Sequence, residues 1–249
     1  MTDIHCHILP GVDDGADDMG ESLLMARLSG LSGVETIVAT PHCNTPQGDR
    51  NFRTDELRDR FVELVRQLKD AGTKVSIFPG AEVFCTEETP ELLRKGRLLT
   101  LAGSRYLLTE FYFDESLEFI DDMLAKLAAE GVTPVIAHPE RYYELQRMPE
   151  HAAEWFRAGY VIQVNKDSLL GGLGRRAGNA SRELLRMGLA HVVASDAHSS
   201  IERNTDMSRV QRLIEDEFSA EYARILLELN PKRILRDETL VPADGANRF

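Results

Sequence analysis

The sequence predicts an α/β fold in which a parallel sheet closes into a barrel. Short runs rich in β-branched residues alternate with longer amphipathic segments along the chain. This alternation is typical of strands and crossover helices in a parallel sheet, and we favour a closed barrel over an open sheet. The length, 249 residues, lies within the range of one α/β barrel, so we expect a single domain over residues 1–249.

Seven strands are expected, each a short apolar run that ends at a polar residue. They are "TDIHCHI" from Thr2, "ETIVATPH" from Glu35, "KVSIFPGAE" from Lys74, "RYLLTEF" from Arg105, "TPVIAHPER" from Thr133, "YVIQVN" from Tyr160 and "HVVASDAH" from His191.

Helices are expected between the strands, where periodic segments begin near a capping residue and end near glycine. They are "ESLLMARLSGL" from Glu21, "TDELRDRFVELVRQLKDAG" from Thr54, "SLEFIDDMLAKLAAEG" from Ser116 and "SRELLRMG" from Ser181. The stretch "GGLGRRAGN" from Gly171 lacks the ending of a phosphate-binding loop, so we interpret it as a flexible loop. The polar residues 237–249 are expected to fray as a tail.

Composition narrows the classes of function. A formal net charge of −12 argues against a nucleic-acid groove, which needs dense lysine and arginine. The chain shows no apolar run of membrane-spanning length and no basic segment before its first strand, so we expect a cytoplasmic protein without membrane insertion. The cysteines Cys6, Cys43 and Cys85 are odd in number and form no CxxC pair, which favours neither a disulfide framework nor a thiolate zinc site.

Histidines and acids stand at or beyond the ends of six of the seven expected strands. The carboxyl ends of barrel strands meet on one face, so we expect these residues to meet in one site. His5 and His7 are two residues apart and therefore point to the same side of their strand. With Asp14 from the first loop the candidates number nine: His5, His7, Asp14, His42, Glu82, Glu110, His138, Asp196 and His198.

Imidazoles and carboxylates without thiolates favour divalent ions such as Mn²⁺, Fe²⁺ or Zn²⁺. A catalytic ion keeps about three to five protein ligands, so this set suits about two or three ions. Asp13 could compete with Asp14 as a ligand, but we interpret it as a turn residue before Gly15. His151 and His191 lie on an expected helix and at a strand start, and we expect structural roles for both.

The segments "DIHCH", "VDDG", "ATPH", "GAE", "LLTEF", "VIAHPER" and "ASDAH" resemble the signatures of the PHP superfamily, the polymerase and histidinol phosphatase metallohydrolases. Their order most resembles the bacterial manganese-dependent tyrosine-protein phosphatases of capsular and exopolysaccharide operons. The resemblance implies a distorted seven-stranded TIM-like barrel and a site of about three metal ions. It places His5, His7, Glu82 and Asp196 on one ion, Glu82, Glu110 and His138 on a second, and Asp14, His42 and His198 on a third.

The resemblance also implies hydrolysis of phosphotyrosine on a protein partner, the tyrosine-rich tail of an autophosphorylating bacterial kinase that controls polysaccharide export. We expect direct hydrolysis, in which the ions activate water for in-line attack on phosphorus without a phosphoenzyme. Arg141 and Arg203 are expected to clamp the phosphate.

Several alternatives follow from the same residues. A cysteine-dependent phosphatase needs C-x₅-R, and Cys43 misses Arg50 by one position. A PHP-type enzyme for a small ester such as histidinol phosphate would use the same ligands, and a non-catalytic metal-containing regulatory module also stays open. A polymerase-associated nuclease is disfavoured by the acidic charge.

Two segments near the expected site have an open role. The residues Phe111, Tyr112, Tyr142 and Tyr143 are interpreted mainly as packing residues, with a slot for the substrate ring as the alternative. The loop 44–54 covers the site or serves as a mobile connector.

Overall fold

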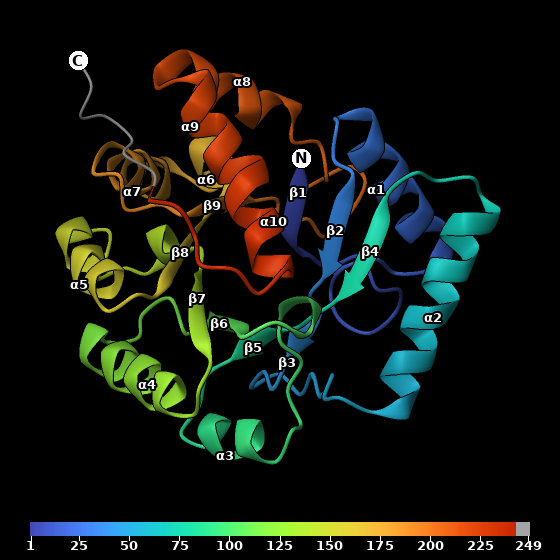
Figure 1. Ribbon diagram of the computed structural model, residues 1–249, viewed down its shortest axis with the longest axis horizontal. Coiled ribbons are helices and arrows are strands. Elements are labelled where there is room, and N and C mark those ends of the chain that lie inside the picture. The colour runs from blue at the N-terminus through green and yellow to red at the C-terminus, as the bar shows by residue number, and fades with distance from the viewer. Residues whose placement is uncertain (243–249) are drawn as a thin grey trace.

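The computed structural model describes residues 1–242 and contains two sheets in which all paired strands are parallel (Figure 1). The first has the order β1-β2-β4, with β1 (Thr2–Cys6), β2 (Thr36–Ala39) and β4 (Ser76–Pro79). The second has the order β3-β5-β6-β7-β8-β9, with β3 (His42–Cys43), β5 (Glu82–Phe84), β6 (Tyr106–Glu110), β7 (Thr133–Ala137), β8 (Val161–Asn165) and β9 (Val192–Ala194).

Two of the expected strands are each broken in two. The expected strand 35–42 divides into β2 and β3 around Pro41, which has no backbone N–H for the ladder. The expected strand 74–82 divides into β4 and β5 at Gly80, where an added Cβ would lie 2.8 Å from Val38 Cγ1. Each break passes the chain from one sheet to the other.

The two sheets meet where the first strand lies beside the last. The backbone N–H of His7 donates to the carbonyl of Ala197 at 2.9 Å, and that of Asp196 donates to the carbonyl of His5 at 2.8 Å. On the other side, the short helix η1 (Leu101–Gly103) packs against both β4 and β6. The ends of strands that are almost 200 residues apart in the sequence therefore share one rim.

Helices surround the sheets (Figure 1). Asp18, Thr54 and Ser116 cap α1, α2 and α4 by accepting from the backbone N–H three residues on. The helices are α1 (Met19–Leu31), α2 (Asp55–Asp70), α3 (Thr89–Arg94), α4 (Leu117–Ala129), α5 (Ala152–Arg157), α6 (Lys166–Leu169), α7 (Arg175–Arg186), α8 (Ser208–Glu217), α9 (Ala220–Arg224) and α10 (Asn230–Leu235), with the short helices η2 (Pro139–Arg141), η3 (Pro149–His151) and η4 (Ile225–Leu229). No helix within residues 1–242 has the length and apolar character that crossing a membrane requires.

Two local expectations are wrong. The stretch from Gly171 is not a flexible loop throughout, because α7 begins at Arg175 after Gly174, whose φ of 89° suits glycine. Residues 237–242 are held to the body of the protein: the backbone N–H of Arg105 donates to Asp237 Oδ1 at 2.8 Å, and the Tyr106 hydroxyl donates to the carbonyl of Glu238 at 2.7 Å. The expected tail beyond residue 242 lies outside the described residues.

Strand alternation places apolar residues deep in the barrel and polar residues at its rim. In β6, Tyr106 and Leu108 pack in an inner apolar cluster. Glu110 comes two residues after Leu108 and therefore lies on the same face of the strand. In the same way, Val192 and Ala194 of β9 belong to this cluster and precede Asp196. The pattern therefore supports a polar site on top of an apolar core.

Candidate metal centre

All nine residues expected at the strand ends meet at this rim. Their ligand atoms form three groups, and within each group the atoms lie within 4.8 Å of one another. The groups are His7, Asp14, His42 and His198; His5, Glu82, His138 and Asp196; and His42, Glu82 and Glu110. The third group contains His42, which also belongs to the first, and Glu82, which also belongs to the second.

Glu82 lies at the centre of the cluster. Its carboxylate is buried. Each of its two oxygens lies close to ring nitrogens of two histidines, Oε1 to those of His5 and His138 and Oε2 to those of His7 and His42. The separations are 3.2 Å to His5 Nε2, 3.3 Å to His7 Nε2, 3.0 Å to His42 Nδ1 and 3.0 Å to His138 Nε2. Asp14 closes the outer end of the cluster, with Oδ1 at 3.4 Å from both His42 Nε2 and His198 Nε2.

The hydrogen bonds of the histidines aim free ring nitrogens into the cluster. The Nδ1–H groups of His5, His7 and His198 donate to Gln163 Oε1, Asp13 Oδ2 and the carbonyl of Asp196, at 2.9, 2.8 and 2.9 Å. These bonds leave each Nε2 with its lone pair directed inward, the arrangement that metal-binding histidines use.

Several buried polar atoms at the centre lack an ordinary partner. Within residues 1–242, Glu82 Oε2, His42 Nδ1 and His198 Nε2 are buried and form no hydrogen bond of good geometry, although His42 Nδ1 lies 3.0 Å from Glu82 Oε2 and His198 Nε2 lies 3.4 Å from Asp14 Oδ1. Native proteins rarely leave such atoms unpaired. Imidazole and carboxylate donors suit divalent first-row ions, so the residues fit a group of such ions.

Burial perturbs the acid–base behaviour of the cluster. Burial, together with the neighbouring Glu82, raises the pKa of Glu110 to about 8. Burial lowers the pKa of His138 to about 4, with an added contribution from Arg141, so this imidazole is neutral at pH 7. Glu110 thus needs a nearby cation to stay ionised at neutral pH, whereas His138 is already in the ligand form.

Two of the nine residues have an unusual backbone conformation. His138 has φ of 33° and Asp196 has φ of 50°, both in the left-handed region that residues other than glycine seldom adopt. His138 directly follows β7 and Asp196 lies two residues beyond the end of β9, so each turn directs the side chain over the rim. Strain of this kind is typical of functional sites.

Asp13 and Gln163 are functional residues that the sequence interpretation missed. Asp13 does form the expected turn, because its Oδ1 accepts from the Gly15 N–H at 3.0 Å. Its Oδ2, however, accepts from His7 Nδ1 and from the His42 N–H, both at 2.8 Å, and so fixes two candidate ligands. The available signals were a second acid beside Asp14 and a polar residue inside the strand "YVIQVN".

Arg141 and Arg203 both border the cluster. A guanidinium nitrogen of each lies near Asp196 Oδ2, at 3.4 Å for Arg141 and 2.7 Å for Arg203. The same oxygen accepts from Asn165 Nδ2 at 2.7 Å. Arg141 lies over the Phe113 ring, 4.2 Å from its centroid. Both side chains are partly exposed and can reach an anion placed over the rim.

A cleft of about 560 Å³ adjoins the cluster on the side of Asp14, His42 and Glu110. The loop 44–54 forms one of its walls and is tied down by Asn44, whose Nδ2 donates to the Phe84 carbonyl at 3.1 Å. Of the aromatic candidates, Phe111 and Tyr142 are buried, and both Phe111 and the exposed Tyr112 are part of the cleft lining.

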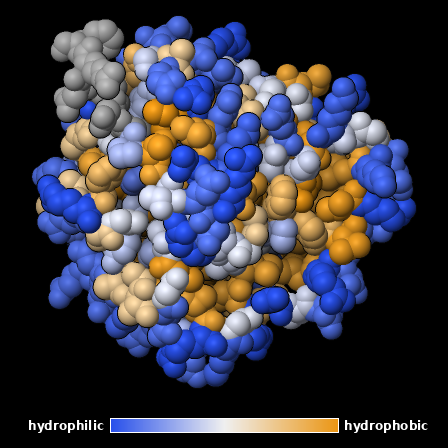
Figure 2. All heavy atoms as spheres, in the orientation of Figure 1, coloured by the Kyte–Doolittle hydropathy of each residue, from blue (hydrophilic) through white to orange (hydrophobic). Residues whose placement is uncertain are grey.

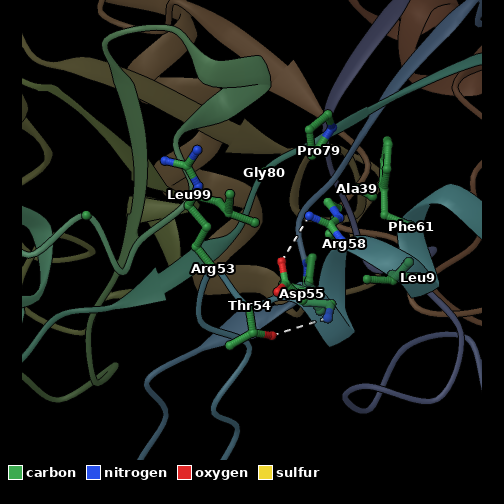
Figure 3. A pocket seen from close by; sticks show the side chains of 13 residues that line it. Leu9, Ala39, Arg53, Thr54, Asp55, Arg58, Phe61, Pro79, Gly80 and Leu99 are labelled. Atoms are coloured by element: carbon green, nitrogen blue, oxygen red, sulfur yellow. Dashed lines mark hydrogen bonds and ion pairs between the residues drawn. The ribbon is translucent and has the colours of Figure 1, made fainter.

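A second hollow, of about 700 Å³, lies between α2 and the strands β2 and β4 (Figure 3). Apolar residues gather on this face of the molecule (Figure 2). None of the nine candidate ligands lines this hollow, and the guanidinium of Arg58 is paired with Asp55 at 2.9 Å. We therefore assign the site to the rim of the barrel.

The remaining histidines have structural contacts. His151 Nε2 lies 3.0 Å from both oxygens of Asp121, which also accepts from Trp155 Nε1 at 2.6 Å. Asp121, His151 and Glu154 form a separate group of ligand type at the surface. His191 Nδ1 accepts from the Ile162 N–H at 3.1 Å, and its ring stacks on Phe156.

The cysteines lie outside the chemistry of the site. All three are buried and form no disulfide. Burial raises the pKa of Cys43 to about 12, which keeps its thiol protonated. No cysteine is therefore placed as a thiolate nucleophile.

The chain is similar in sequence to tyrosine-protein phosphatases. The chain is 35% identical over 240 residues to the tyrosine-protein phosphatase YwqE of Bacillus subtilis, covering 96% of this chain and 93% of that protein. It is 32% identical over 245 residues to the tyrosine-protein phosphatase CpsB of Streptococcus pneumoniae, covering 96% and 100%.

Solved structures give the same result. The fold matches a crystal structure from a study of YwqE and CpsB, described as unique metal-dependent tyrosine phosphatases, with a TM-score of 0.90, 34% identity and full coverage of both chains. A phosphotriesterase from Mycobacterium tuberculosis shares only the fold, at a TM-score of 0.59, 12% identity and coverage of 96% and 95%. Residues 1–236 match the model of the family "Capsular polysaccharide synthesis, CpsB/CapC". The chain therefore belongs to the CpsB/CapC family.

Proposed function

We propose that this protein is a metal-dependent protein-tyrosine phosphatase. The observation that carries the proposal is the convergence of nine imidazole and carboxylate groups with two guanidinium groups around one rim. Such a site suits a phosphate ester, whose charge the cations and arginines balance. Its relatives YwqE and CpsB are tyrosine-protein phosphatases, which supports the same assignment.

The nine residues would hold about two or three divalent ions, with Mn²⁺ as the expected metal and Fe²⁺ or Zn²⁺ as alternatives. By the resemblance, His5, His7, Glu82 and Asp196 would hold one ion, Glu82, Glu110 and His138 a second, and Asp14, His42 and His198 a third. The ligand atoms group differently in the structure, where His7 lies with Asp14, His42 and His198, and His138 lies with His5, Glu82 and Asp196. When bound, such ions supply Lewis-acid chemistry, which activates water and neutralises charge on phosphate.

The arginines orient the substrate. Arg141 and Arg203 now share the Asp196 carboxylate and would turn toward the phosphate oxygens, which they bind as planar, permanently charged donors. Asp13 and Gln163 keep His7 and His5 in one tautomer during the reaction. A phenol has a pKa near about 10, so its departure from phosphorus requires less help from a protein acid than departure of a serine alkoxide.

The physiological substrate would be a phosphotyrosine protein of capsule or exopolysaccharide synthesis, such as the tyrosine-rich tail of a bacterial kinase. The name of the family, which refers to capsular polysaccharide synthesis, supports this setting. We further infer a cytoplasmic, single-domain protein over residues 1–249. Its fold is a distorted seven-stranded barrel when β2 with β3, and β4 with β5, each count as one strand.

Phosphate release tests the proposal directly. The purified protein is assayed with a phosphotyrosine peptide, the matching phosphoserine peptide and histidinol phosphate, each with added Mn²⁺ and with EDTA. Turnover that depends on Mn²⁺ and is confined to phosphotyrosine is the expected result. A preference for histidinol phosphate, or no turnover of any ester, would reject it in favour of a small-ester phosphatase or a non-catalytic module.

A further inference from the structure

The cleft beside the metal centre has one polar and one aromatic wall. Thr45, Gln47 and Asp49 of the loop 44–54 form the polar wall. The Thr45 Oγ1 hydroxyl donates to Asp49 Oδ2 at 2.6 Å, so these two side chains of the polar wall are hydrogen-bonded to each other. The facing aromatic residues are Phe84, Phe111, Tyr112 and Phe113, of which Tyr112 is exposed and packs against Phe84.

The aromatic wall is built by two neighbouring strands. Phe84 is the last residue of β5, and Tyr112 follows the end of β6, the next strand in the sheet. Their rings meet edge to face, with centroids 4.7 Å apart and planes at 74°. Phe84 is 7% exposed, whereas Tyr112 is 45% exposed, so its ring is accessible to a ligand. Such a pair accepts a third ring in a stacked or edge-on contact.

The position of the cleft suits the leaving group of a phosphate ester. The arginines approach the centre beside Asp196, whereas the cleft opens beside Asp14, His42 and Glu110. Neither Arg141 nor Arg203 lines the cleft, although Arg141 lies over the ring of Phe113, which is part of its lining. A phosphate held by the arginines therefore leaves this separate side free for the group attached to its ester oxygen.

We propose that Phe84 and Tyr112 form the specificity wall, which binds the phenol ring of the substrate and favours phosphotyrosine over esters without a ring. This inference rests on the proposed phosphatase function and names the residues that select its substrate. Tyr112 supplies the accessible contact, and Phe84 fixes the orientation of the Tyr112 ring. Phosphoserine has no ring to place against this wall.

Inhibition by phosphonates tests the wall without depending on turnover of poor substrates. Phenylphosphonate and methylphosphonate share the anionic head and differ in the ring. In the Mn²⁺-loaded protein, the ratio of their inhibition constants measures the ring contact. An aromatic contact corresponds to a ratio change of about twofold to tenfold. Tyr112→Ala should reduce the preference for phenylphosphonate by this factor, whereas Tyr112→Phe should retain it.

Tyr143→Ala is the matched control, because Tyr143 is 52% exposed but does not line the cleft. It should leave the ratio unchanged. Phosphotyrosine turnover by the unaltered protein separates the two hypotheses. If that turnover is present and Tyr112→Ala keeps the full ratio, the specificity wall is refuted while the phosphatase function stands. If the unaltered protein fails to hydrolyse phosphotyrosine, the proposed function is wrong, and the specificity wall, which rests on it, is rejected as well.

Discussion

The adjacent acids Asp13 and Asp14 have different roles. Asp14 points toward His42 and His198, whereas Asp13 is turned the other way and binds the back of His7. Gly15 permits this arrangement, because a Cβ there would lie 2.2 Å from the His7 carbonyl oxygen. At the scale of single residues, the motif "DDG" thus combines one candidate ligand, one positioning residue and one space for backbone contact.

Asp13→Asn should weaken metal binding while leaving the fold intact. An amide can still occupy the turn, but it no longer holds the His7 Nδ1–H with a charged acceptor. Loss of such an outer partner costs about 10-fold to 100-fold in metal affinity or activity. Activity titrated with Mn²⁺ should reach half its maximum at a correspondingly higher concentration. The exposed Asp17→Asn is the control, and identical titration curves for both variants would contradict the role of Asp13.

Arg141→Ala should mainly raise KM for a phosphotyrosine peptide. The guanidinium faces the rim beside Asp196 and would lose its contact with the phosphate, worth about 1.5–3 kcal/mol for a hydrogen bond to a charged group. Steady-state kinetics at saturating Mn²⁺ measure the effect. Kinetic constants equal to those of the unaltered protein would remove Arg141 from the substrate site.

At the scale of elements, the sequence predicted where strands end better than where they break. The ends carry a histidine or an acid after an apolar run, so local pattern and chemistry coincide at His42, Glu82 and Glu110. The breaks at Pro41 and Gly80 depend on how two sheets pack, which one strand's pattern does not contain. Short helices such as α3, α5 and α6 also escaped prediction, because segments of 4–6 residues show little helical periodicity.

For the candidate site, the sequence likewise predicted some residues and missed others. Ligand-type residues have a chemical signature, and all nine meet at the rim. Gln163 and Phe84 have no such signature, because a glutamine or phenylalanine in a strand has many ordinary uses. Their roles follow only from the tertiary contacts with His5 and Tyr112.

Gly15→Ala should destabilise the segment between β1 and α1. The new methyl group would overlap the His7 carbonyl and side chain, at 2.2 and 2.4 Å, and overpacking of this kind costs about 1–3 kcal/mol. Denaturant unfolding measures the loss. Gly172→Ala is the control, since its nearest contact would be an ordinary 3.5 Å, and equal midpoints for both variants would contradict the proposed close approach.

His191, between α7 and β9, should contribute to acid sensitivity. Burial lowers its pKa to about 4, below the unfolded value of 6.5. Its stabilising contribution is therefore complete above pH 6.5 and is lost as the pH falls toward 4, by about 2 to 3 kcal/mol at pH 4.5. Unfolding free energies at pH 7.5 and 4.5, measured in EDTA, should differ less in His191→Asn by this amount. An unchanged difference would contradict a neutral buried His191.

At the scale of the whole molecule, the chain has a surplus of acidic residues, with a net charge of −12. The ring of strands gathers several of these acidic groups in one place. Glu82, Glu110 and Asp196 lie buried together, and burial disfavours the ionised form of each carboxylate unless cationic groups lie beside it. Ions that bind only the folded state stabilise it by mass action. Thermal unfolding should therefore shift upward with increasing Mn²⁺ and fall in EDTA, and a melting temperature independent of Mn²⁺ would argue against a metal-dependent rim.

The central claim is that the strand ends hold a metal centre that hydrolyses phosphotyrosine. The most direct test is to strip the protein with EDTA, reconstitute it with Mn²⁺, and measure bound manganese by elemental analysis beside phosphotyrosine turnover. We expect about two or three ions per chain, with both bound manganese and turnover reduced in His198→Ala and unchanged in His151→Ala. Turnover that persists without bound manganese, or manganese that follows His151 instead of His198, would contradict it.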